Sequence, residues 1–315
     1  MAETVTKSNA ASGMAPTAER RPFTAFDFAL YAISVLVWGL SWIAMHYQVA
    51  TVAPAVSIVW RFAISAPSVL AIAALRGEPL RFTFADHRYF LGLGAAIFST
   101  NFLLFYYAAQ HVASGLLSIV FSLASIGNVV LGALIFRTRI DRRVVIGGML
   151  GVGGVAAMFY PALGGVHLDL AALIGLALSV TGTVCFCIGN MLSFAAQRRR
   201  LPIFATTGWG MVYGTAFMTV FALLHGDHFT LEWSATYVGG LLYLSIIGSV
   251  LAFSVYFTLL GRIGAARAGY TTVMYPVVAL VVSTFFEGYQ WSLLSALGLM
   301  AALLGNVLVL RAPRR

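Results

Sequence analysis

A single arginine lies inside an otherwise apolar stretch of the sequence. Arg61 is the one residue among the 19 lysines and arginines that falls well inside such a stretch. A charge at membrane depth is costly and commonly marks a functional site. The planar guanidinium can bind a carboxylate through two parallel hydrogen bonds, so Arg61 is a candidate for binding a substrate carboxylate. The alternative is structural: an ion pair with Glu287, or bonds to backbone carbonyls near one end of the stretch.

Few other polar side chains lie deep in the apolar stretches. Asn101 and Asn128 can each donate and accept hydrogen bonds, and Ser125 and Ser249 each add a hydroxyl group. Together they would suit the amino and carboxylate groups of an amino acid. The alternative is that they bond neighbouring helices, a contribution that is modest in membranes.

Aromatic residues are abundant in the same stretches and predict a broad apolar pocket. Such a pocket would bind large side chains by buried area rather than by specific bonds. Packing and the membrane-interface belt account for some of them. Pro276 lies within the ninth stretch, where it removes a backbone donor and predicts a bend used in gating rather than direct binding. The aromatic candidates are Trp38, Trp42, Phe105, Tyr213, Tyr243 and Tyr275.

The composition identifies the elements that must position these residues. The chain has 315 residues, of which 60% are apolar and 9% are charged, and its mean hydropathy is +0.91. A soluble domain usually carries about 25% charged residues. A helix needs roughly 20 apolar residues to cross a bilayer. The sequence therefore predicts an all-α integral membrane protein with ten spans, at 26–46, 54–75, 89–110, 112–136, 144–163, 170–192, 203–224, 235–260, 266–286 and 293–310.

The basic residues fix the expected orientation. Apart from Arg61, the 18 remaining lysines and arginines fall in the two tails and in the loops after the even-numbered stretches. Loops rich in lysine and arginine stay in the cytoplasm. Both termini are therefore expected on the cytoplasmic side, and the net charge of +9 reflects topology rather than binding to nucleic acid.

The chain shows signs of an internal duplication. A shift of 151 residues lays the third to fifth stretches over the eighth to tenth, and it superposes Gly147 on Gly298 and Gly154 on Gly305. Because each half holds five stretches, the two halves would be inverted, as in carriers that alternate access around a midplane site. We expect a disordered cytoplasmic tail at 1–23 and five-helix halves at 24–163 and 168–311.

Several functional classes are not expected. The sequence carries no phosphate loop, no ligand spacing for a metal and no nucleophile–base pair, so no cofactor, metal or catalytic residue is predicted. No aspartate or glutamate lies near the middle of a stretch, which favours facilitated transport over coupling to protons or sodium. A membrane-embedded enzyme acting on lipid is the alternative from another class, and only the loop around His225 and His228 could serve it.

Short motifs follow one another in a fixed order along the chain. They are Trp38-Gly39-Leu40-Ser41-Trp42, Arg61-Phe62, Tyr107-Ala108-Ala109, Gly248 to Phe253, Gly264 to Ala268, and Tyr275-Pro276 with Glu287 eleven residues later. Together they resemble the drug/metabolite transporter superfamily, specifically its ten-helix branch with two EamA-type domains, over about residues 24–311.

The resemblance implies a monomer in the bacterial inner membrane, with a cavity lined by helices 1, 3, 4, 6, 8 and 9. Within the branch, the sequence is most similar to exporters of aromatic and other neutral amino acids, which implies Phe, Tyr, Trp, Leu and Met as substrates. Export of amphipathic drugs or metabolites is the alternative. Because Ser125 and Phe136 stand where members often have proline and glutamate, we expect an asymmetric site.

Overall fold

The structure is a computed structural model that describes residues 24–49, 52–136, 140–162, 169–263 and 271–311. All regular elements in these ranges are helical. They are α1 (Ala25–Gln48), α2 (Pro54–Leu75), α3 (Phe84–Ala95), η1 (Ala96–Asn101), α4 (Phe102–Ala108), α5 (Ser114–Ser122), α6 (Ala124–Phe136), α7 (Arg142–Ala162), α8 (Leu170–Arg198), α9 (Ile203–His225), α10 (Ala235–Leu242), η2 (Tyr243–Leu251), α11 (Ala252–Ile263), α13 (Thr271–Phe286) and α14 (Leu293–Leu310).

Hydrophobic helices long enough to cross a bilayer dominate the chain. Eight helical segments of the described residues reach the necessary length and hydropathy, and two shorter apolar helices follow at Thr271–Phe286 and Leu293–Val309. These two lie where the ninth and tenth spans are expected. Large apolar side chains are exposed along α7, α8 and α14, and only lipid can cover such surfaces favourably. The protein is therefore a multi-pass membrane protein.

Local sequence signals explain where the helices begin and end. Thr24 and Asp27 form a reciprocal capping box at the start of α1, and Ser234 caps α10 by accepting a hydrogen bond from the backbone N–H of Tyr237. Pro54 occupies the first turn of α2, where its missing N–H costs nothing. Gly226 ends α9 with a φ of 82°, a conformation that favours glycine.

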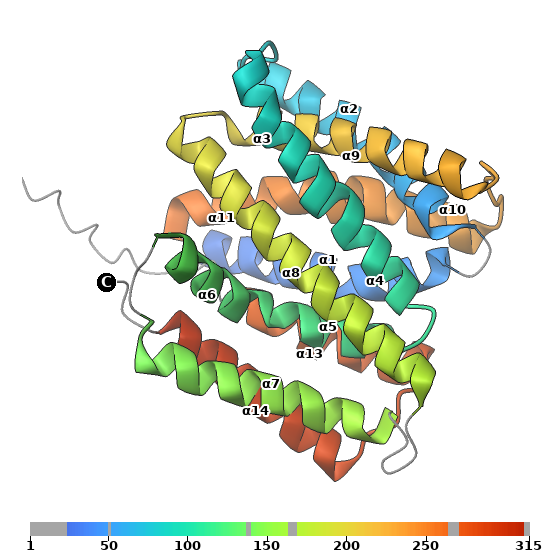
Figure 1. The fold of residues 1–315 in the computed structure, drawn as a ribbon, viewed down its shortest axis with the longest axis vertical. Coiled ribbons are helices and arrows are strands. Elements are labelled where there is room, and N and C mark those ends of the chain that lie inside the picture. Colours follow the sequence, from blue (N-terminus) through green and yellow to red (C-terminus); the bar gives the residue numbers. More distant parts are fainter. Residues whose placement is uncertain (1–23, 50–51, 137–139, 163–168, 264–270, 312–315) are drawn as a thin grey trace, which may run out of the picture.

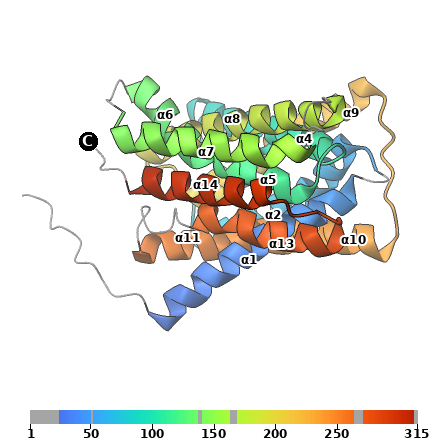
Figure 2. The same cartoon turned by 90° about the horizontal axis from the view of Figure 1, so that it is seen from below.

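The helices form one bundle with two distinct edges. Figures 1 and 2 show α7 and α14 side by side at one edge, while Figure 1 shows α2, α3 and α9 at the opposite edge. Between them, α1 packs on α13 and α11, α13 packs on α5, and α8 packs on α4, α5 and α6. Helices from both expected halves are therefore interleaved across the middle of the bundle.

Four glycines bring α7 and α14 into backbone contact. A Cβ atom on Gly147 would lie 2.5 Å from the carbonyl oxygen of Gly305, and one on Gly298 would lie 2.6 Å from that of Gly154. Such approaches exclude any side chain, because the atoms in the way belong to the backbone. A shift of 151 residues superposes Gly147 on Gly298 and Gly154 on Gly305. The Gly147–Gly305 contact and the Gly154–Gly298 contact therefore correspond to each other in the repeat.

Three expected helices are locally irregular. The third and eighth spans each contain a π-helical segment, η1 and η2. The fourth span is divided at Leu123, between α5 and α6. There, Ser122 donates to the carbonyl of Ile119 and Ser125 donates to the carbonyl of Ser122, and such bonds from serine to the backbone tend to bend helices.

Candidate functional site

A group of four aromatic rings lies where α1, α4, α5 and α8 meet. Trp42 stacks edge to face on Phe105 and on Phe121, with ring centroids 5.3 and 5.5 Å apart, and Phe121 lies 4.6 Å from Phe186. Trp42, Phe121 and Phe186 are half-buried, whereas Phe105 is 3% exposed. We call these four residues the α8 aromatic group. Their accessible rings provide an apolar surface between helices of the two expected halves.

A second aromatic group surrounds Trp38. Its ring lies 5.6 Å from Phe253, 5.2 Å from Tyr256 and 5.4 Å from Tyr275. The indole of Trp38 also donates to the carbonyl of Gly248 at 3.1 Å. The hydroxyl of Tyr243, in turn, donates to the carbonyl of Val37 at 2.8 Å. These two bonds join α1 to η2, so Trp38 and Tyr243 hold two helices together in this conformation.

An asparagine pair lies about one helical turn beyond the α8 aromatic group. Asn190 follows Phe186 by four residues on α8, and its Nδ2 donates to Oδ1 of Asn128 at 3.2 Å. Both side chains are half-buried. Within the described part of the chain, Nδ2 of Asn128 and Oδ1 of Asn190 make no further hydrogen bond. The pair therefore presents one donor and one acceptor next to an apolar surface.

Two other polar candidates are already bonded to neighbouring helices. Asn101 is 4% exposed, and its Nδ2 donates to the carbonyl of Gly182 on α8 at 2.8 Å. Ser125 donates to Oδ1 of Asn306 on α14, and Asn306 donates to Ser122 at 3.1 Å. These bonds satisfy buried groups and tie helices together, as the structural interpretation of the sequence predicts.

Arg61 is buried among polar and aromatic side chains of three helices. It is 5% exposed, and its Nη2 lies 3.4 Å from the hydroxyl of Ser249 on η2. Its guanidinium carbon lies 4.5 Å from the ring centroid of Phe102 on α4 and 5.4 Å from that of Phe62. The ion pairs recorded among the described residues involve His46, Arg199, His225 and Arg262, and none of them includes Arg61.

Glu287 belongs to a different contact from the one expected with Arg61. Both of its oxygens accept the backbone N–H of Ser114 at 3.1 Å, and Oε2 also accepts the hydroxyls of Ser114 and Ser283. His46 Nδ1 lies 3.2 Å from Oε1. The carboxylate thus joins the start of α5 to the ends of α1 and α13. Arg61 lies on α2, which packs on α9 and η2, whereas Glu287 directly follows α13, which packs on α1 and α5. The two residues therefore have separate partners.

Of the three remaining candidates, Tyr213 lies apart from these groups, whereas Tyr275 belongs to the group around Trp38. Tyr213 on α9 hydrogen-bonds Nδ1 of His87 at 3.0 Å and packs beside Trp209, towards α3. Tyr275 is 4% exposed and donates to Thr271 at 3.0 Å. Pro276 lies inside α13, which is helical throughout from Thr271 to Phe286.

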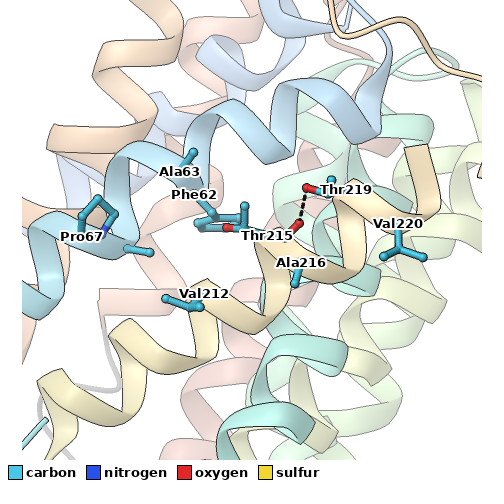
Figure 3. A pocket seen from close by; sticks show the side chains of 9 residues that line it. Phe62, Ala63, Pro67, Val212, Thr215, Ala216, Thr219 and Val220 are labelled. Atoms are coloured by element: carbon cyan, nitrogen blue, oxygen red, sulfur yellow. Dashed lines mark hydrogen bonds between the residues drawn. The ribbon is translucent and has the colours of Figure 1, made fainter. Parts of the chain in front are cut away.

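Two open grooves lie on the outside of the bundle. The larger, of about 490 Å³, runs between α2 and α9, and Figure 3 shows the lining side chains from both helices. Its hydroxyls are those of Thr215 and Thr219, which donate to carbonyls of their own helix. The second, of about 280 Å³, lies between α8 and the α5–α6 span. The first groove is lined by exposed apolar side chains, among them Ala63, Pro67 and Val220. It is therefore a surface for lipid.

Sequence reasoning did not identify several residues at these contacts. Phe121, Phe186 and Asn190 complete the α8 aromatic group and the asparagine pair, and His46 completes the contact of Glu287. One signal was available: Phe186 and Asn190 are four residues apart, so they share one face of a helix.

Comparison with a protein family gives matches over both halves. The model of the EamA-like transporter family matches residues 28–160 and again residues 173–311. The two matches are of similar length.

Individual proteins are similar along nearly the whole chain. A probable amino-acid metabolite efflux pump of Salmonella typhimurium is 25% identical over 299 residues, which cover 91% of this chain and 97% of the relative. An uncharacterized transporter of Archaeoglobus fulgidus is 25% identical over 281 residues, covering 89% and 97%. One solved crystal structure, 15% identical, covers 90% of this chain and 95% of its own with a TM-score of 0.66, which supports the fold alone.

Proposed function

We propose that this chain, which belongs to the EamA-like transporter family, exports aromatic and other neutral amino acids across the inner membrane of a bacterium. The relatives from Salmonella typhimurium and Escherichia coli named as probable amino-acid metabolite efflux pumps support the substrate class. The observation that carries the proposal is the α8 aromatic group beside the asparagine pair. No catalytic role is proposed for any residue.

The proposed topology is ten helices in two inverted halves, 24–163 and 168–311, with both tails in the cytoplasm. The exchange of the Gly147–Gly305 and Gly154–Gly298 contacts under a 151-residue shift supports it. The π-helical segments support it too, because η1 and η2 lie in the third and eighth spans, which correspond in the repeat.

The substrate would bind with its side chain on the α8 aromatic group and its charged groups at the asparagine pair. The free Nδ2 of Asn128 suits the carboxylate, and the free Oδ1 of Asn190 suits the ammonium group. Rings of Phe, Tyr or Trp would add edge-to-face contacts, and Leu or Met would gain from area alone. Trp38, Tyr243, Tyr275 and Ser249 would form the surrounding wall, and Asn101 and Ser125 would hold the helices that carry it.

Transport would proceed by alternating access. The Glu287 contact closes the outer ends of α1, α5 and α13 in this conformation, and its opening would release substrate outside. The bend expected at Pro276 would serve this movement of α13. Because the proposed site contains no carboxylate, the expected driving force is the substrate gradient.

Export of amphipathic drugs or metabolites is the second candidate. The α8 aromatic group would also bind an aromatic cation through the faces of its rings. The two candidates differ in their need for a carboxylate on the substrate.

Counterflow into liposomes tests the proposal. We expect saturable exchange of radiolabelled Phe and Trp, unaffected by a pH gradient, and no exchange of a quaternary ammonium compound. Asn128→Ala should raise the half-saturating Phe concentration at least about tenfold, since one hydrogen bond to the charged carboxylate is lost. Thr181→Ala is the matched control, because Thr181 is exposed on the same α8 and bonds its own backbone. Flux of the ammonium compound without flux of Phe would favour the second candidate.

A further inference from the structure

The surroundings of Arg61 contain three buried polar atoms that form no well-shaped hydrogen bond within the described protein. They are Nε of Arg61, the hydroxyl of Tyr106 on α4, and the hydroxyl of Ser245 on η2. Tyr106 and Ser245 are fully buried, and Arg61 is 5% exposed. Buried polar groups are normally hydrogen-bonded, so three such atoms in one region need an explanation.

These atoms lie in one region of the bundle. The Tyr106 hydroxyl lies beside Arg61, and Nη2 of Arg61 points to Ser249. Ser65 connects the two helices: its hydroxyl is 2.8 Å from the carbonyl of Arg61 and 3.1 Å from that of Ser245. The groups therefore share the place where α2, α4 and η2 meet.

The positive charge of Arg61 is not balanced within the described protein. The rings of Phe102 and Phe62 stabilise it in part, as aromatic faces attract cations. A charge buried without an ionic partner is nevertheless strongly unfavourable. Within the described protein, its polar side-chain contacts are with the neighbouring hydroxyl of Tyr106 and with Ser249, whose 3.4 Å approach is long for a hydrogen bond.

We propose that Arg61, Tyr106 and Ser245 form a binding site for a small monovalent anion. The guanidinium would supply the charge, and the two hydroxyls would donate hydrogen bonds to the anion. Nε and both hydroxyls would then be satisfied together. The anion has two sources with the same chemistry, a free halide such as chloride or the carboxylate of an amino acid. In the second case the inference rests on the proposed function, and the carboxylate would bind at Arg61 instead of at Asn128.

Thermal unfolding of the purified protein in detergent tests this site without requiring transport. The midpoint is measured by tryptophan fluorescence in sodium chloride, sodium bromide and sodium gluconate at one ionic strength. Gluconate, a large and strongly hydrated anion, serves as the reference. If the anion is a halide, chloride and bromide should raise the midpoint by several degrees over gluconate with saturable concentration dependence, and Arg61→Gln should abolish the shift.

Two variants separate loss of binding from loss of folding. Tyr106→Phe removes one hydroxyl, and it should weaken half-saturation by chloride at least fivefold while the gluconate midpoint stays within a few degrees. Arg76→Gln is the control, since Arg76 is exposed at the end of α2 and stacks on Phe204. It should leave the halide response unchanged.

Thermal unfolding in the presence of an amino acid identifies the source of the anion. If L-Phe in gluconate raises the midpoint through Arg61 and 2-phenylethylamine, which lacks the carboxylate, does not, the anion is the substrate carboxylate. A halide response without any effect of L-Phe supports the anion site and counts against amino-acid export. If neither halide nor L-Phe stabilises the protein through Arg61, and Tyr106→Phe behaves as the wild type, the anion site does not exist.

Discussion

Replacement of Glu287 by glutamine should open the end of the bundle that the proposed topology places outside the cell. The carboxylate accepts the backbone N–H and hydroxyl of Ser114 and the hydroxyl of Ser283, and it lies 3.2 Å from Nδ1 of His46. Its side chain is 5% exposed. Glutamine keeps the shape but offers a single acceptor oxygen, and its amide group would face donors. The contact is therefore weakened without a cavity.

The size of the effect follows from the bonds that are lost. A hydrogen bond to a charged group contributes about 1.5–3 kcal/mol, and a buried donor left without a partner costs about 1–3 kcal/mol. We expect Glu287→Gln to destabilise the closed outer end by about 2–3 kcal/mol, since the open state exposes this residue to water. At about 1.4 kcal/mol per factor of ten, the equilibrium shifts about 30- to 150-fold towards the open state.

Cysteine labelling measures that shift. Ser118 lies one turn beyond Ser114 on α5 and is 1% exposed. Ser118→Cys is made in a variant whose Cys185 and Cys187 are replaced by alanine. A maleimide that cannot cross membranes is then added from outside intact cells. If the open state is about 1% populated in the parent protein, labelling in the Glu287→Gln background should accelerate at least 20-fold.

The chain offers a matched control for this experiment. Asp227 contacts His225 at 2.8 Å, but both residues lie beside the end of α9 rather than on different helices. Asp227→Asn should therefore leave the labelling rate of Ser118→Cys unchanged. An unchanged rate in Glu287→Gln, with normal expression and thermal midpoint, would refute the assignment of this contact as the outer closure.

Two further predictions concern stability and are read from the thermal midpoint in detergent. Gly154→Ala should lower the midpoint by many degrees, because the new Cβ would meet the backbone of Gly298 and Ala302, whereas Gly153→Ala should leave it nearly unchanged, since nothing lies within 4 Å of that position. Asp27→Asn should lower the thermal midpoint more than Asp86→Asn, although both residues take part in capping a helix. Asp27 is 2% exposed and pairs with Arg262 at 2.5 Å. The contact of Asp86 with Arg199 is 3.5 Å long and more exposed, so its loss should cost less.

The sequence predicts the helices better than their irregularities. Apolar length and hydropathy locate the long helices, because a span needs a minimum number of apolar residues regardless of its neighbours. The break at Leu123 and the π-helical segments escape this approach. The break depends on how the side chains of Ser122 and Ser125 bond to the backbone, and on Asn306, a partner from a distant helix.

The sequence predicts only part of the candidate site, because contacts between helices decide the rest. Residue type and depth identify Trp42, Phe105 and Asn128, but they do not say which neighbouring helix each one faces. Phe186 and Asn190 on α8 become partners only when α8 lies beside α5 and α6. Arg61 and Glu287 were expected at the same depth in the membrane, which suggested an ion pair between them. In the structure each residue contacts other partners.

Hydrogen bonding distinguishes the structural polar residues of this bundle from those that we assign to ligands. Asn101 uses its donor on Gly182, and Ser125 uses its hydroxyl on Ser122 and Asn306, so each has little left for a substrate. The asparagine pair keeps one donor and one acceptor, and the guanidinium of Arg61 keeps an unpaired Nε. In a medium of low polarity such groups persist only where binding or opening to water satisfies them during the working cycle. The unsatisfied groups, rather than all polar groups at membrane depth, are therefore the first targets for mutation.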